Sequence, residues 1–129
     1  MGTIYADAII EGSDLHWKTD VVPLADAMEV IEYLQGVSYR LADPGASQDV
    51  QISLIAQEVE ECFPEIVHTD EHGYKSVSYA RLVAPLIEGM KAQQVGIDVL
   101  EDKVLGLEAR NAQLEARLSR LDALLRGDR

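Results

Sequence analysis

The sequence predicts an α+β protein, in which a small mixed head of short strands and helices precedes a long C-terminal helix. Two patterns support this class. Residues 1–78 alternate short apolar runs with turns marked by Gly and Pro, and from Tyr79 onward apolar residues recur at spacings of three and four. The first pattern is typical of short strands and helices, and the second is typical of a coiled coil. The 129 residues suffice for one domain, or for one domain with an extension.

The first third of the chain contains one expected strand and one expected helix. Thr3–Ile10 alternates loosely before a Glu-Gly turn, which predicts a short strand. Ser13–Asp20 is polar and fits either a loop or a short strand. Pro23–Leu34 has apolar residues at helical spacing, with Asp20 and Pro23 as start signals.

The middle of the head is expected to hold two strands and a short helix. Val37–Leu41 and Gln51–Ile55 read as strands on either side of a loop, Ala42–Asp49, that is rich in Pro, Gly, Ala and Ser. Ala56–Phe63 reads as a two-turn helix that Pro64 closes. Its glutamates at 58, 60 and 61 are expected to form a solvated face.

A hairpin is expected next. Ile66–His68 and Tyr74–Val77 flank a Thr-Asp-Glu-His-Gly turn with Gly at its far end. His68 and His72 lie on either side of acidic residues, but a hairpin tip offers little rigidity for a set of metal ligands. The sequence therefore predicts no metal site and no cofactor.

The C-terminal helix carries one uninterrupted heptad register. The a positions are Val83, Met90, Ile97, Val104, Asn111, Leu118 and Leu125, and the d positions are Tyr79, Leu86, Gln93, Leu100, Leu107, Leu114 and Leu121. Basic residues at g face acidic residues at e five positions later, as in parallel, in-register helices: Lys103 with Glu108, Arg110 with Glu115, and Arg117 with Asp122. Pro85 is expected in the first turn, where its missing N–H costs little.

Two polar residues interrupt the apolar seam of this helix. Gln93 at d and Asn111 at a are expected to be polar layers that fix the register. Val and Ile at a with Leu at d favour two strands, and so does an Asn at a. The heptads alone therefore favour a dimer.

Charge and composition exclude several classes of partner. The net charge is −12, and residues 1–78 hold most of the acidic side chains with only three basic ones. Binding to nucleic acid needs clustered Lys and Arg, and an anionic membrane surface needs the same. Cys62 is the only cysteine, so no intrachain disulfide forms. We expect a soluble protein without an export signal, nucleic-acid partner or membrane span.

The stretch LIAQEVEECFPEIVHTDEHGYKSVSYARLVAPLIEGM, residues 54–90, carries a family resemblance. An IAQEVEE helix closed by Pro-Glu, an acidic Gly turn, a YKSVSY strand and a Leu-rich helix follow one another in that order. This order resembles the C-terminal intramolecular chaperone of phage tail spikes and fibres, the self-cleaving family typified by endosialidases. The resemblance covers roughly Ser13–Lys91. It implies a homotrimer, hence a parallel trimeric coiled coil, because the fibres that these domains serve are three-fold.

The resemblance also implies a division of the chain. Residues 1–12 would end the upstream fibre or spike segment, 13–78 would form the chaperone head, and 79–129 the trimerisation helix. The partners implied are two further copies of the chain and its own upstream fibre domain. Assembly would take place in the host cytoplasm, and the upstream part would remain in the virion tail.

The candidate chemistry lies at Ser13-Asp14-Leu15-His16-Trp17-Lys18. This segment resembles the family's cleavage motif, Ser-Asp-x-Arg-Leu-Lys, with Ser13 on the nucleophile, Lys18 on its base and Asp14 on the family's Asp. His16 and Trp17 replace the family's Arg and Leu. The resemblance places the cut between Gly12 and Ser13. A neutral Lys within hydrogen-bond reach can activate a Ser hydroxyl.

Two alternatives remain open at this stage. The domain could be a permanent trimerisation module in which Ser13 and Lys18 are structural and no cleavage occurs. The chain could instead be an unrelated coiled-coil adaptor whose acidic head binds a basic partner.

Overall fold

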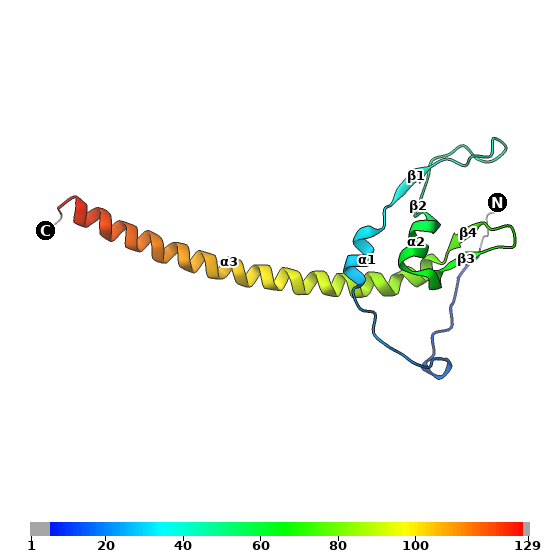
Figure 1. The fold of residues 1–129 in the computed structure, drawn as a ribbon, viewed down its shortest axis with the longest axis horizontal. Helices are drawn as coiled ribbons and strands as arrows, with labels where there is room; N and C mark the ends of the chain where they lie inside the picture. The colour runs from blue at the N-terminus through cyan, green and yellow to red at the C-terminus, as the bar shows by residue number, and fades with distance from the viewer. Residues whose placement is uncertain (1–5, 128–129) are drawn as a thin grey trace.

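The computed structural model describes residues 6–127 and shows a small head at the base of one long helix (Figure 1). The elements follow in order: a 3-10 turn at Leu15–Trp17, α1 at Ala27–Tyr33, β1 at Val37–Tyr39, β2 at Gln51–Ser53, α2 at Ala56–Cys62, a 3-10 turn at Pro64–Ile66, β3 at Val67–Thr69, β4 at Lys75–Val77, a 3-10 turn at Tyr79–Leu82, and α3 at Val83–Leu125. The α+β class is thus confirmed. No helix in the described part of the chain is long and apolar enough to cross a membrane.

The four strands form two separate antiparallel hairpins. In the first, Val37 of β1 pairs with Ser53 of β2, and the long connection between them extends away from the head (Figure 1). In the second, Val67 of β3 pairs with Val77 of β4. The turn of the second hairpin follows its sequence signature, because Gly73 adopts φ +83°, which favours glycine.

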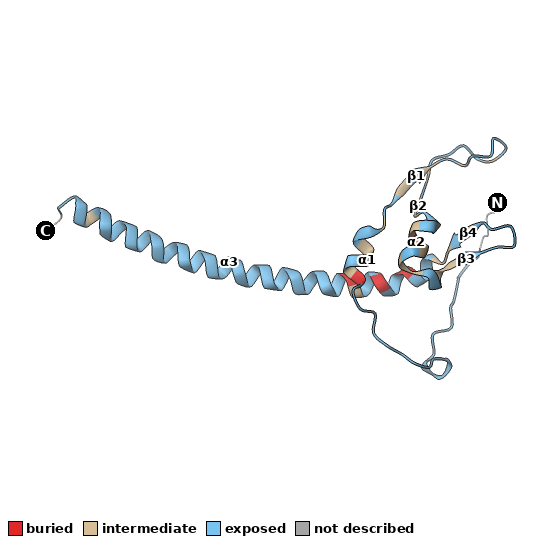
Figure 2. Ribbon diagram, in the orientation of Figure 1, coloured by how far each residue is buried: buried red, intermediate tan, exposed pale blue. Residues whose placement is uncertain are grey.

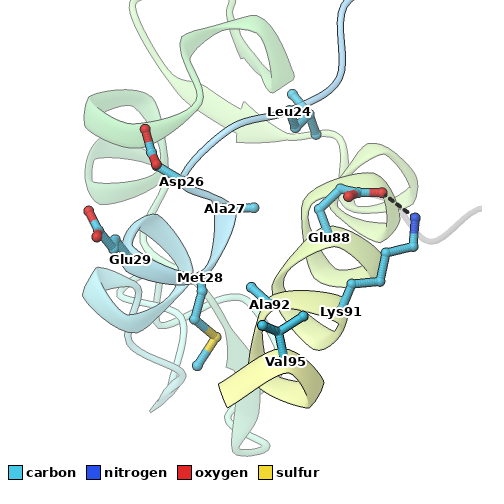
Figure 3. A pocket seen from close by; sticks show the side chains of 9 residues that line it. All are labelled: Leu24, Asp26, Ala27, Met28, Glu29, Glu88, Lys91, Ala92 and Val95. Carbon is cyan, nitrogen blue, oxygen red and sulfur yellow. Dashed lines mark hydrogen bonds and ion pairs between the residues drawn. The ribbon is translucent and has the colours of Figure 1, made fainter. Parts of the chain in front are cut away.

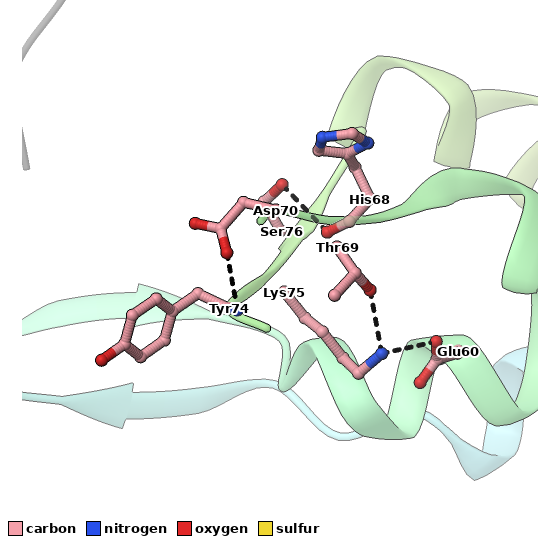
Figure 4. A network of polar contacts seen from close by, with 7 residues as sticks. All are labelled: Glu60, His68, Thr69, Asp70, Tyr74, Lys75 and Ser76. Atoms are coloured by element: carbon pink, nitrogen blue, oxygen red, sulfur yellow. Dashed lines mark hydrogen bonds and ion pairs between the residues drawn. The ribbon is translucent and has the colours of Figure 1, made fainter. Parts of the chain in front are cut away.

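A small cluster around α2 holds the second hairpin. Val59 on α2 is fully buried. Lys75 Nζ on β4 lies 2.7 Å from Glu60 Oε1 on α2 and 3.0 Å from Thr69 Oγ1 on β3, so one ammonium ties the hairpin to the helix (Figure 4). The expectation of a fully solvated glutamate face is therefore wrong: Glu60 is paired, and Glu58 Oε2 is buried without a hydrogen-bond partner among the described residues.

The helix α1 packs against the first turns of α3, and the buried residues of α3 lie there (Figures 1 and 2). Gly89 makes this approach possible, because a Cβ there would lie 2.6 Å from Ile31 Cδ1 on α1. Leu24, Ala27 and Met28 line a cavity of about 370 Å³ against Ala92 and Val95 on α3 (Figure 3). Gly89 is at g and Ala92 at c of the heptad, so α1 covers a flank of α3 and leaves the a and d seam free.

The long helix begins one turn later than the heptad pattern suggested. Tyr79 lies in a 3-10 turn, and its hydroxyl accepts a hydrogen bond of 2.9 Å from the backbone N–H of Leu54. Tyr79 therefore joins the helix start to the head. Pro85 lies at the third position of α3, within the first turn as expected.

The start of the chain differs from the expectation of a strand at Thr3–Ile10. Residues 6–10 form no strand, and residues 3–5 lie outside the described part. Ile9 and Ile10 are 84% and 91% exposed, since no neighbouring strand offers them a ladder. The helix expected from Pro23 begins only at Ala27, because Asp26 before it takes a left-handed conformation with φ 54°.

Little of this single chain is buried. Within residues 6–127, the buried hydrophobic residues are Ala27, Val59 and Leu82. Figure 2 shows most of α3 as exposed. The large apolar side chains along its seam are exposed: Val83, Leu86, Met90, Ile97, Leu100, Val104, Leu107, Leu114, Leu118, Leu121 and Leu125. A helix of 43 residues with an open apolar seam is the form that a coiled-coil strand has before its partners are added.

Candidate functional site

A tight turn shapes the segment at the start of the head. Asp14 is the N-cap of the 3-10 turn Leu15–Trp17, and its side-chain Oδ1 accepts a 2.9 Å hydrogen bond from the backbone N–H of His16. Two backbone bonds close the turn: Trp17 N–H donates to Asp14 O at 3.2 Å, and Lys18 N–H donates to Leu15 O at 3.0 Å. Of the two possibilities that the sequence left open, loop or strand, the segment is a loop that contains this turn.

The turn brings together the two residues at the ends of the motif. Lys18 Nζ lies 2.7 Å from Ser13 Oγ, within hydrogen-bond reach. Five residues in extended form would span about 16 Å, so the turn is what allows this contact. A neutral amine at that position could accept the hydroxyl proton and leave a serine alkoxide.

Asp14 and His16 form a second pair beside the first. His16 Nδ1 lies 2.8 Å from Asp14 Oδ1, the same oxygen that accepts the backbone N–H. The His16 backbone N–H, then the His16 side chain and the charge of Lys18, hold the pKa of the Asp14 carboxyl below its usual value. Asp14 therefore remains an acceptor until the solution is strongly acidic.

All of these residues are exposed in the single chain. Ser13, Asp14, His16 and Lys18 face solvent, and Gly12 precedes them in an extended segment. Trp17, which replaces the family's Leu, is 86% exposed. The exposed turn therefore has the contact geometry of a Ser–Lys dyad. It lacks the desolvation that a lysine base needs, because water stabilises a lysine ammonium.

The other predicted site residues lie elsewhere. Gln93 and Asn111 are on α3, with their side chains exposed as the rest of the seam is. Within residues 6–127, no group of three or more His, Cys, Asp and Glu side chains could hold a metal ion. His68 and His72 do not converge with the acidic turn into such a group, although His72 Nε2 lies 3.6 Å from Glu71 Oε1.

No pattern in the sequence identified Lys75 and Tyr79 as residues that join parts of the head. A lone Lys in a strand and a Tyr at a heptad position look ordinary, and only the fold brings them to Glu60 and Leu54. Both contacts fix the base from which α3 extends.

The fold and the turn together define a class of protein. Its members have a small head with a Ser–Lys contact at its start, followed by a long helix with an open apolar seam. Residues 13–68 match the peptidase S74 family, described as the chaperone of endosialidase. The match begins at the serine that contacts Lys18. The family resemblance drawn from the sequence is thus confirmed over this segment.

Two relatives extend the comparison beyond the head. The chain is 29% identical over 99 residues to the long tail fiber protein Gp37 of Enterobacteria phage K3, and equally to that of Enterobacteria phage T2. These alignments cover 72% of this chain but only 8% and 7% of the two fibre proteins. The chain thus spans less than a tenth of the length of these relatives.

Proposed function

We propose that this chain is a C-terminal trimerisation chaperone of a phage tail fibre or spike, which releases itself by cutting between Gly12 and Ser13. The main support for this proposal is the 2.7 Å contact between Lys18 Nζ and Ser13 Oγ, since Ser13 is the first residue of the family match. Residues 1–12 would end the fibre segment, 13–78 would be the chaperone head, and 79–129 the trimerisation helix.

The open seam of α3 supports the assembly half of the proposal. Three parallel copies would bury the a and d side chains that the single chain exposes. The g-to-e charge pairs favour a parallel, in-register arrangement, although each exposed pair contributes only about 0.5 kcal/mol or less. Since α1 covers the c and g flank, the head leaves the seam open to partner helices.

The proposed reaction needs only this chain and water. Lys18 in its neutral form takes the proton of Ser13 Oγ, which attacks the carbonyl carbon of Gly12. The bond from that carbon to the Ser13 nitrogen breaks, and the amine leaves with the proton from Lys18. The ester then linking Gly12 to Ser13 Oγ is hydrolysed, which gives a Gly12 carboxylate and restores the hydroxyl.

Assembly would supply what the single chain lacks. A lysine is neutral near pH 7 only when burial or a nearby cation disfavours its ammonium form. Neighbouring copies that cover the exposed turn, with Trp17 as one contact, would remove water from Lys18. Cleavage would then follow correct trimerisation and make that step effectively irreversible.

The named relatives support the proposed setting. Both are long tail fibre proteins of phages, so the partner proposed here is an upstream fibre domain of the same chain. Folding and release would occur in the host cytoplasm during virion assembly, and the upstream part would remain in the tail.

The test is the intact mass of the freshly purified chain and of its variants. We expect one cut, with a new N-terminal Ser13, and no cut in Ser13→Ala or Lys18→Ala. Lys18→Arg should also remain intact, since Arg cannot act as a neutral base near pH 7. Lys91→Ala, which removes an exposed lysine on α3, is the matched control and should be cut as the wild type is.

The outcomes separate the proposal from its alternatives. Cleavage that persists in Lys18→Ala would reject the dyad. An intact wild-type trimer, carrying its native upstream segment, would support the permanent trimerisation module instead. A chain that neither trimerises nor cuts would favour a coiled-coil adaptor with an acidic head.

A further inference from the structure

A carboxylate that takes no part in the proton transfer described above lies at the start of the turn between Ser13 and Lys18. Asp14 Oδ1 receives two hydrogen-bond contacts, from the His16 backbone N–H at 2.9 Å and from His16 Nδ1 at 2.8 Å. Both hold the first residues of the turn Leu15–Trp17 in place. The turn then carries Lys18 back to Ser13.

We propose that Asp14 is a positioning residue for self-cleavage: its carboxylate caps the turn that places Lys18 on Ser13, and His16 clamps that carboxylate. The inference rests on the proposed function and adds a role for Asp14 and His16. The role is that of an N-cap, whose side-chain oxygen satisfies a backbone N–H left free at the start of a helical turn.

The cap needs an oxygen acceptor and not a charge, since Asn caps a helical turn about as well as Asp. The 2.8 Å contact with His16 Nδ1 holds the carboxylate of Asp14 beside the turn. His16 and Lys18 are the groups that lower the pKa of Asp14 in the described chain.

This difference between an oxygen acceptor and a charge gives a sharp set of variants. Asp14→Asn keeps an oxygen acceptor and removes the charge, so it should cleave at about the wild-type rate. Asp14→Ala loses the cap and should cleave roughly 3- to 30-fold more slowly, the factor expected for the loss of an N-cap. Asp14→Ser, which restores a capping oxygen, should recover most of that loss. Glu29→Ala, which removes an exposed acidic charge on α1, should leave the rate unchanged.

Two results in the cleavage assay would overturn the inference. If Asp14→Asn were as slow as Asp14→Ala, the carboxylate charge itself would be required, which points to a chemical role in place of positioning. If Asp14→Ala were cut at the wild-type rate, the cap would be irrelevant.

A second measurement keeps the inference testable even if the wild type is not cut, an outcome that defeats the proposed function. In the uncut Ser13→Ala chain, the NMR shift of the His16 amide proton should follow the ionisation of Asp14, with a midpoint below the value of about 3.9 for a free Asp. The transition should vanish in Asp14→Asn. A His16 amide that does not respond in this range would show that the cap does not form.

Discussion

At the scale of single residues, the head is joined by a few polar contacts. Lys75 connects a strand to α2, Tyr79 connects the start of α3 to Leu54, and the Tyr33 hydroxyl donates a 3.4 Å bond to Glu61 Oε2 on α2. The Glu61 carboxylate raises the pKa of Tyr33 above its usual value. Two of these contacts are exposed and the third is part-buried, so the head of one chain has little to hold it beyond Val59 and the packing of α1.

Cys62 offers a test of how well α2 is packed. Burial, followed by the charges of Glu61 and Glu58, raises the pKa of its thiol. Because the thiolate is the reactive form, alkylation by iodoacetamide at pH 7.5 should be several-fold slower than for a free cysteine, and its rise with pH should come later. Mass spectrometry follows the reaction. The same chain in 8 M urea is the control and should react as a free thiol does, whereas equal rates in both conditions would mean that α2 is not packed.

At the scale of elements, the local signals predicted most of the head. Pro64 after Ala56–Cys62 and Gly73 in the second hairpin lie where their backbone preferences require, so those elements appear as expected. The start of α1 was missed because a left-handed Asp26 overrides the signal of Pro23. The predicted N-terminal strand does not form in residues 6–10, because alternation alone does not supply a partner strand. Of the candidate site, the motif identified Ser13 and Lys18, but the cap at Asp14 is visible only in the folded turn.

The polar layers of α3 give a prediction at this scale. Replacing Gln93 or Asn111 by Leu should raise the melting temperature by several degrees, because a polar group at a or d is buried at a cost in the assembly. The same change should weaken the choice of one oligomeric state, seen as a mixture in sedimentation experiments. Gln113→Leu, at an outward c position, is the matched control and should change neither property. Unchanged melting and a single unchanged state in both variants would show that the register is misassigned at these layers.

At the scale of the whole molecule, the open seam predicts an oligomer, and the family resemblance implies that it has three chains. We therefore expect sedimentation equilibrium to give a homotrimer. Leu107→Asp, at a d position, should convert it to a monomer and also prevent cleavage if the site is completed only on assembly. Leu105→Asp is a close control. Leu105 is 63% exposed and Leu107 is 59% exposed in the single chain, so only the heptad register distinguishes the two leucines.

Each result bears on a separate part of the proposal. A wild-type monomer or an antiparallel pair would contradict the assembly, and a dimer would contradict the three-fold expectation alone. Cleavage that persists in monomeric Leu107→Asp would contradict the coupling of chemistry to assembly and leave the dyad standing.

If the chain assembles as proposed, the unfilled seam of α3 would also make this protein sensitive to its own abundance. A helix without tertiary partners is only marginally stable in water, so forming α3 and associating with other copies would be one equilibrium. The amount of a three-chain product varies with the cube of the free chain concentration, and the apparent stability of the product rises with that concentration. Chains made early in an infection would stay apart, and those made later would assemble together once their number passed a threshold. The fibre's assembly would thereby be timed by mass action, without a separate signal.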